Sequence, residues 1–174
     1  MPSIDPSAFE AAVLPHLDAA YTLARYLLRE DADAQDAVQE ACLRALRYFA
    51  GFRGQEGRAW LLRIVRNVCY TWRQRHRDGP DLAPLDEELH AEHLAGDSPE
   101  DALIAAAGHD ALHAAIQALP TPFREVIVLR ELEGLSYGEI GEVAGVPVGT
   151  VMSRLSRARK RLQETLRPSA PEAL

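Results

Sequence analysis

Apolar residues recur every three or four positions wherever this chain can form a core, and that spacing restricts the fold to helices. No window alternates apolar and polar residues as a half-buried strand would. Helices are predicted at residues 9–28, 33–49, 61–72, 98–119, 121–132, 136–144 and 148–166. The same spacing assigns to buried faces Leu14, Val38, Ala41, Cys42, Ala45, Phe49 and Trp72. The sequence therefore predicts an all-α fold.

The helical pattern is interrupted once, by an acidic segment. Nine Asp and Glu but no Lys or Arg lie between residues 81 and 110. Gly79, Pro80, Pro84 and Gly96 punctuate this part of the chain, which favours a flexible linker. We therefore expect two small helical domains joined by a flexible acidic linker, with boundaries at 1–78, 79–97 and 98–168 and a tail at 169–174.

The net charge of −7 argues at first against a nucleic-acid partner. However, residues 1–80 hold 11 Lys and Arg against 10 Asp and Glu, and residues 111–174 hold 8 against 7. Within these nearly neutral parts, the bases gather at residues 53–77 and 150–167. The negative charge therefore belongs to the linker, and two basic stripes remain available to a polyanion.

The second basic stripe lies on the longer helix of a predicted helix-turn-helix. Residues 136–144 form a short helix that opens with a capping box at Ser136 and Glu139, and a Gly-Val-Pro turn separates it from the helix at 148–166. Small side chains and arginines there suit a major groove, because arginine can bond guanine through two atoms. The alternative is a solvated basic face of an ordinary bundle. The candidate duplex-binding residues are Thr150, Ser153, Arg154, Arg157, Lys160 and Arg161.

The first basic stripe combines arginines with aromatic residues and an amide. Such a mixture suits single-stranded DNA, whose bases can be stacked and hydrogen-bonded. The alternative, an amphipathic helix with a solvated basic face, carries equal weight on this pattern alone. The candidates are Phe52, Arg53, Trp60, Arg63, Arg66, Asn67, Tyr70 and Arg73. A mixed polar face on the preceding helix, which could simply face solvent, holds Asp36, Gln39, Glu40 and Arg44.

Several classes of protein are disfavoured. No apolar run reaches the roughly 20 residues of a membrane span. The two cysteines, Cys42 and Cys69, lie within apolar patterns, which favours a reducing, cytoplasmic location over a disulfide scaffold. His90 and His93 resemble a pair of metal ligands, but a flexible linker does not supply the fixed geometry that a metal site needs. We expect no enzymatic activity, no metal and no cofactor.

Two longer segments together resemble bacterial RNA polymerase sigma factors of the extracytoplasmic-function group. Sigma domain two is similar to DADAQDAVQEACLRALRYFAGFRG followed by RAWLLRIVRNVCYTWRQRHR, and sigma domain four to LPTPFREVIVLRELEGLSYGEIGEVAGVPVGTVMSRLSRARKRL. The order of the two modules is the one found in the family. The chain departs from the family pattern at Met152, where a lysine is usual, and at Gly138 and Gly141, where stronger helix formers are usual.

The resemblance implies roles for the candidate residues. It implies that the face at Asp36–Arg44 docks on core RNA polymerase, that the first stripe opens and binds the single-stranded −10 element, and that the second reads the duplex −35 element. It implies that residues 123–133 lie near the polymerase flap, and it implies an anti-sigma factor as a partner. Two alternatives remain: a sigma-like mimic that titrates an anti-sigma factor, and a stand-alone helix-turn-helix regulator.

Overall fold

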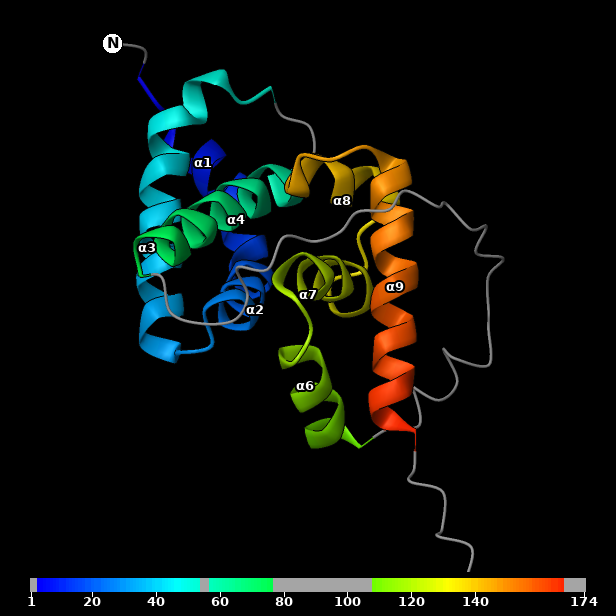
Figure 1. The fold of residues 1–174 in the computed structure, drawn as a ribbon. Helices are drawn as coiled ribbons and strands as arrows, with labels where there is room; N and C mark the ends of the chain where they lie inside the picture. Colours follow the sequence, from blue (N-terminus) through cyan, green and yellow to red (C-terminus); the bar gives the residue numbers. More distant parts are fainter. Residues whose placement is uncertain (1–2, 54–56, 77–107, 168–174) are drawn as a thin grey trace, which may run out of the picture.

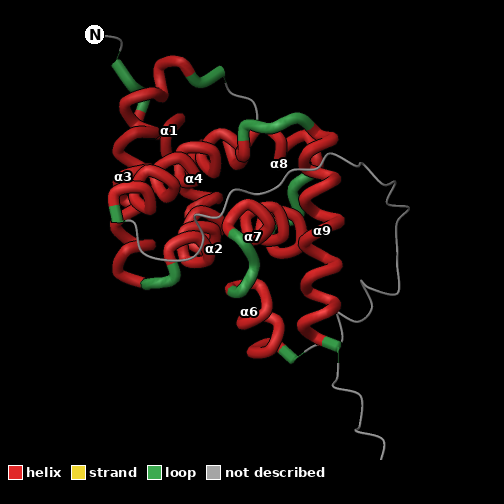
Figure 2. The backbone as a smooth tube through the Cα atoms, viewed as in Figure 1, coloured by secondary structure: helices red, strands yellow, loops and turns green. Residues whose placement is uncertain are grey.

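The computed structural model describes residues 3–53, 57–76 and 108–167, and these residues contain helices and loops but no strand (Figure 2). The all-α prediction is confirmed. The predicted linker at 79–97, the predicted helix start at residue 98, the histidine pair and the tail lie outside the described residues. The helices are α1 Pro6–Val13, η1 Leu14–His16, α2 Leu17–Leu28, α3 Asp31–Tyr48, η2 Phe49–Gly51, α4 Gly57–Arg75, α6 His109–Gln117, α7 Thr121–Ile127, η4 Val128–Leu132, α8 Tyr137–Ala144 and α9 Val148–Leu166.

The first predicted helix is broken in two. Pro15 lies in the short 3-10 turn η1, between α1 and α2. Proline has no backbone N–H to donate, so it interrupts the hydrogen-bond ladder of an α-helix. Leu14, which the spacing assigned to the core, is 56% exposed at this break. The prediction of one continuous helix over 9–28 was therefore wrong, as was the placement of Leu14 in the core.

Helix α3 contributes a row of alanines to the core of the first module. Ala34, Ala37, Ala41 and Ala45 are all buried, and α3 packs against both α2 and α4. Small side chains on such a face allow helices to approach closely. The prediction that Ala41 and Ala45 are buried is confirmed. Val38, Cys42 and Phe49 of the same predicted face are only half-buried, as is Trp72 on α4. The buried face is thus centred on the alanines, and Val38 and Cys42 pack at its edge.

The second module contains the predicted helix-turn-helix, α8 and α9. The Ser136 side chain accepts a hydrogen bond from the Glu139 N–H at 3.1 Å, and the Glu139 carboxylate accepts one from the Ser136 N–H at 3.1 Å. Gly145 ends α8 in the left-handed conformation, at φ 70°, which glycine adopts without strain. The capping box, the turn and the limits of both helices are confirmed. The two helices are in contact, and their buried residues are Ile140, Val143, Val151, Leu155, Ala158 and Leu162, besides Gly141 and Ala144.

The two glycines of α8 differ in their surroundings. A Cβ at Gly141 would lie 2.8 Å from the carbonyl oxygen of Val146, in the backbone of the turn. A Cβ at Gly138 would meet nothing closer than the Ser136 hydroxyl, at 3.9 Å. The close approach expected at Gly141 is therefore present. Gly138 has no such steric requirement.

We expect Gly141→Ala and Gly138→Ala to change stability in opposite directions. Alanine at 141 must push the turn away, an overpacking cost of about 1–3 kcal/mol that exceeds its helix-propensity gain of about 1 kcal/mol. Alanine at 138 should stabilise the protein by about 0.5–1 kcal/mol. Urea unfolding of both variants measures the difference. Equal shifts of the same sign would contradict the steric role of Gly141.

The two modules pack against each other. Helix α4 of the first module contacts α8 of the second, and α2 contacts α7 (Figure 1). In this view α3 lies at the left edge and α9 at the right edge, with α4, α7 and α8 between them (Figure 1). None of the helices within the described residues is long and apolar enough to cross a membrane.

Candidate nucleic-acid interface

Helix α9 presents the second basic stripe on the side away from its buried face. Lys160 and Arg161 are exposed, and the other four candidates, Thr150, Ser153, Arg154 and Arg157, are half-buried. At the start of the helix, Val148 is 45% exposed and Gly149 has open space around it. The first turn of α9 therefore carries small side chains, and the basic side chains follow further along the helix. This is the arrangement that a helix inserted into a major groove requires.

Two side chains anchor α9 to the rest of its module. The Arg159 guanidinium pairs with the Glu131 carboxylate at 2.7 Å, and the Arg161 guanidinium lies 5.1 Å from the centre of the Phe123 ring. Arg159 was not among the sequence candidates, and its pairing with Glu131 indicates a positioning role. Arg159, which stands between the candidates Arg157 and Lys160 in the sequence, thus attaches α9 to its module.

The first basic stripe is divided between solvent and the contact with the second module. Arg63 and Asn67 are exposed on α4. Arg66 and Tyr70 instead contact Glu125 of α7: the Arg66 Nε donates to the carboxylate at 2.7 Å and the Tyr70 hydroxyl donates at 2.8 Å. Arg73 donates to the Leu27 carbonyl at 2.8 Å, at the C-terminal end of α2. The structure therefore brings only part of the stripe to the surface.

Charge and burial at Glu125 shift the titration of its partners. Glu125 is completely buried, and the Arg66 guanidinium lies over the Tyr70 ring at 3.8 Å from its centre. Burial raises the pKa of the Tyr70 hydroxyl, and the nearby charge of Glu125 raises it further. Burial alone would lower the pKa of Arg66, but the charges and hydrogen bonds of Glu125 and Tyr70 outweigh it and raise that pKa. Both side chains are held in their hydrogen-donating forms.

Phe52, which precedes α4, and Trp60, in the first turn of α4, belong to a cluster of four rings. Their ring centres lie 4.7 Å apart, and Phe49 stacks on Phe52 at 5.6 Å. Phe9 of α1 meets Phe49 edge-on at 5.4 Å. Arg53 is exposed next to this cluster, and residues 54–56 of the loop lie outside the described residues. The cluster fixes the start of that loop on the body of the first module.

The polar face of α3 borders a groove. Asp36, Gln39 and Glu40 are exposed, and Arg44 pairs with Glu40 at 3.0 Å. Asp36, Glu40 and Arg44 line a groove of about 330 Å³ together with residues of α4, including Trp72 and Arg75. A groove between two helices with mixed charge along one wall can accept a helical partner.

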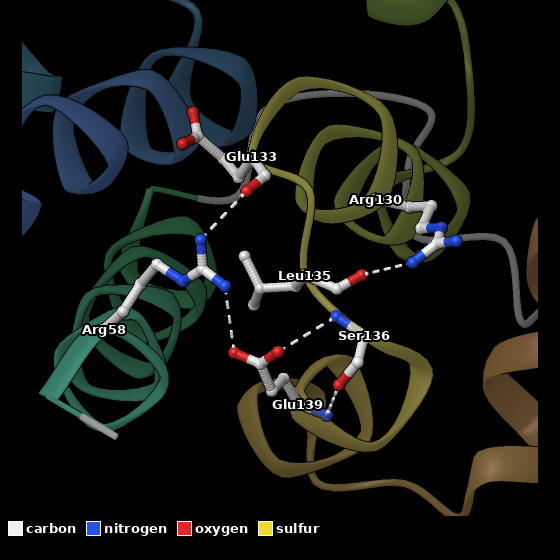
Figure 3. A network of polar contacts seen from close by, with 6 residues as sticks. All are labelled: Arg58, Arg130, Glu133, Leu135, Ser136 and Glu139. Atoms are coloured by element: carbon white, nitrogen blue, oxygen red, sulfur yellow. Dashed lines mark hydrogen bonds and ion pairs between the residues drawn. The ribbon is translucent and has the colours of Figure 1, made fainter. Parts of the chain in front are cut away.

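A second set of polar contacts joins the modules at Arg58, the first arginine of α4. Arg58 donates to the Glu133 carbonyl at 3.2 Å and to the Glu139 carboxylate at 3.1 Å (Figure 3). Burial would raise the pKa of the Glu139 carboxyl, but the hydrogen bonds from Ser136 and Arg58 outweigh it and lower that pKa. The capping residue of α8 thus also binds the first module. Arg130 donates to the Leu135 carbonyl at 2.8 Å beside it (Figure 3).

Sequence reasoning missed Arg58, Arg124 and Glu125. The last two were detectable as unusual, because a charged pair stands within an apolar run at 121–129 whose members are all buried except Pro122. Buried Arg and Glu are rare unless they have partners. The sequence did not indicate which residues those partners are.

Comparisons with known proteins agree with this architecture. Residues 12–78 match the family described as Sigma-70 region 2, and residues 109–162 match Sigma-70, region 4. The RNA polymerase sigma-H factor of Pseudomonas aeruginosa is 36% identical over 176 residues, which cover 97% of this chain and 91% of that protein. The ECF RNA polymerase sigma-E factor of Haemophilus influenzae is 35% identical, with 94% and 90% covered.

Two solved structures resemble the fold across both modules. One is the sigma factor RpoE in complex with the anti-sigma factor NepR from Bartonella quintana, with a TM-score of 0.69 and 31% identity over 93% of this chain and 98% of that one. The other is CnrH in complex with the cytosolic domain of CnrY, with a TM-score of 0.67 and 26% identity over 95% and 92%. Both are complexes of two different proteins.

Proposed function

This chain belongs to the extracytoplasmic-function group of RNA polymerase sigma factors, and on that premise we propose that it binds core RNA polymerase and directs promoter-specific transcription initiation. The observation that carries the proposal is the pair of modules in family order, the second with a capped helix-turn-helix that presents a basic face. In this role α9 enters the major groove of the −35 element, and the stripe on α4 binds the opened −10 element. The protein performs no bond chemistry of its own.

The groove between α3 and α4 is assigned to core polymerase, with Asp36, Gln39, Glu40 and Arg44 as contacts. Its mixed charges and its shape support this assignment. An anti-sigma factor is the second protein partner that we propose, since both similar structures contain a partner protein and the RpoE structure names it as an anti-sigma factor. Both proposed associations support a cytoplasmic location.

Transcription with purified core polymerase tests the function. Start sites mapped after overexpression supply the promoter, and the purified chain should then produce transcripts from it only in the presence of core polymerase. A mimic that titrates an anti-sigma factor would bind its partner without initiating. A stand-alone regulator would bind the duplex but would not replace the missing sigma factor. Either result would overturn the proposal.

Arg154→Ala and Arg157→Ala should each weaken binding to the −35 duplex by about 1–3 kcal/mol, roughly 5- to 150-fold, if each arginine bonds a base through two atoms. Fluorescence anisotropy with a labelled −35 duplex measures the change. Arg167→Ala is a matched control, because Arg167 follows α9 and is not among the candidates. Wild-type affinity in both variants would contradict the assignment of α9.

A further inference from the structure

The carboxylate of Glu125, in the second module, binds two candidate −10 residues of the first module. Its side chain is completely buried, and Arg66 and Tyr70 both donate to it, at 2.7 and 2.8 Å. Arg66 itself is 20% exposed. No solvent therefore reaches the carboxylate, and little reaches the guanidinium while the modules are in contact.

The chemistry of this contact is the same as that of a DNA contact. A guanidinium binds carboxylate and phosphate oxygens with the same planar set of donors. In the closed arrangement the Arg66 guanidinium also covers one face of the Tyr70 ring at 3.8 Å, the face on which a base would stack. The two side chains cannot bind Glu125 and a nucleotide with the same groups at once.

Polar contacts make up part of the interface between the modules, beside buried apolar side chains that both modules contribute. Arg58 binds Glu139 and the Glu133 carbonyl, Arg29 donates to the Gln117 carbonyl at 3.2 Å, and Arg124 to the Tyr26 carbonyl at 3.0 Å. Most of these donors and acceptors can return to water when the modules part. Interfaces between domains of one chain commonly permit relative motion.

We propose that Glu125 is an intramolecular competitor of promoter DNA: it holds Arg66 and Tyr70 on the second module, and the −10 surface is complete only after the modules separate. The inference rests on the proposed function, since it takes the α4 stripe as the −10 surface. Arg63 and Asn67 are exposed in the closed form, so this form retains part of the surface. The duplex-reading face of α9 does not include Glu125 and should work in both forms.

Glu125→Ala and Glu125→Gln in the full chain test this mechanism without core polymerase. The matched control is Asp31→Ala, which removes an ion pair just as short, with Arg25 at 2.6 Å, that lies within the first module and outside the candidate binding residues. Small-angle X-ray scattering reports whether the modules separate, and circular dichroism shows that each variant is folded. Anisotropy with the single non-template strand of the mapped −10 element, and with the −35 duplex, reports binding.

Both Glu125 variants should show a larger radius of gyration and at least five-fold tighter binding to the single strand, with unchanged duplex affinity. The control should match the wild type in all three. Glu125 variants as compact as the wild type would overturn the proposal. Expanded variants with unchanged single-strand affinity would also overturn it, because the carboxylate would then not compete with DNA. Initiation by the wild-type chain with core polymerase is measured separately and does not depend on either result.

Discussion

Leu155→Ala is expected to lower the free energy of unfolding of the second module by about 2–5 kcal/mol. Leu155 is completely buried in the middle of α9, on the face that packs against α8 and α7. Removing its side chain beyond Cβ loses the transfer energy of the buried groups and leaves a cavity that the surrounding helices fill only in part. Such a loss is a large fraction of the stability of a small module.

Urea unfolding followed by circular dichroism measures this change. The matched control is Leu132→Ala in the same module, where the leucine is 43% exposed and truncation should cost much less. Because α8 and α9 hold each other in the geometry needed for duplex binding, Leu155→Ala should also weaken −35 binding at temperatures where the control still binds. Equal effects of the two substitutions would mean that Leu155 is not part of the core that positions α9.

The helix-turn-helix was predictable because its signals are local. Ser136 and Glu139 stand three residues apart and satisfy each other's backbone groups, and Gly145 ends α8 in a conformation that glycine adopts without strain. The apolar residues of α9 repeat with the helical period over 19 residues. Each of these features depends on neighbours within one or two turns, so periodicity and capping rules suffice to locate them.

The first module shows where local rules fail. Pro15 breaks the first helix although the apolar spacing continues through it, because the missing N–H outweighs the pattern. On α3, the predicted Ala41 and Ala45 face the core together with Ala34 and Ala37, whereas the larger Val38 and Cys42, also predicted, pack only at its edge. Spacing identifies an apolar face only to within about one residue, and the choice between neighbouring positions depends on how closely the adjacent helices approach.

The sequence predicted the basic face of α4, but it did not predict that part of this face contacts the second module. Arg66 and Glu125 are 59 positions apart, and Arg58 and Glu139 are 81 apart. Contacts at such separations depend on how the two modules pack together. Neither the spacing of apolar residues nor the composition predicts that packing. The roles assigned to the α4, α9 and α3 faces remain predictions that the proposed experiments test.

Arg124→Met should cost about 2–4 kcal/mol, because each of two backbone carbonyls loses a charged donor. Arg124 is completely buried and donates to the Leu119 carbonyl at 2.8 Å and to the Tyr26 carbonyl at 3.0 Å. Leu119 follows the end of α6, and Tyr26 lies in the last turn of α2, where carbonyls have no partner within the helix. One guanidinium thus serves the C-terminal ends of helices in both modules, where a positive charge also favours the helix dipoles.

The two carbonyls should respond differently to the loss of Arg124. If the modules separate, water can bind the Tyr26 carbonyl in place of Arg124. The stability lost at this carbonyl therefore cannot exceed the free energy with which the two modules bind each other. The Leu119 carbonyl belongs to the same module as Arg124, and its share should therefore persist. Urea unfolding gives the total, scattering reports separation, and Arg47→Met on the exposed side of α3 is the matched control, expected within about 0.5 kcal/mol of the wild type. Wild-type stability in Arg124→Met would mean that apolar packing by methionine fully offsets the lost hydrogen bonds, as replacement of buried charges sometimes does.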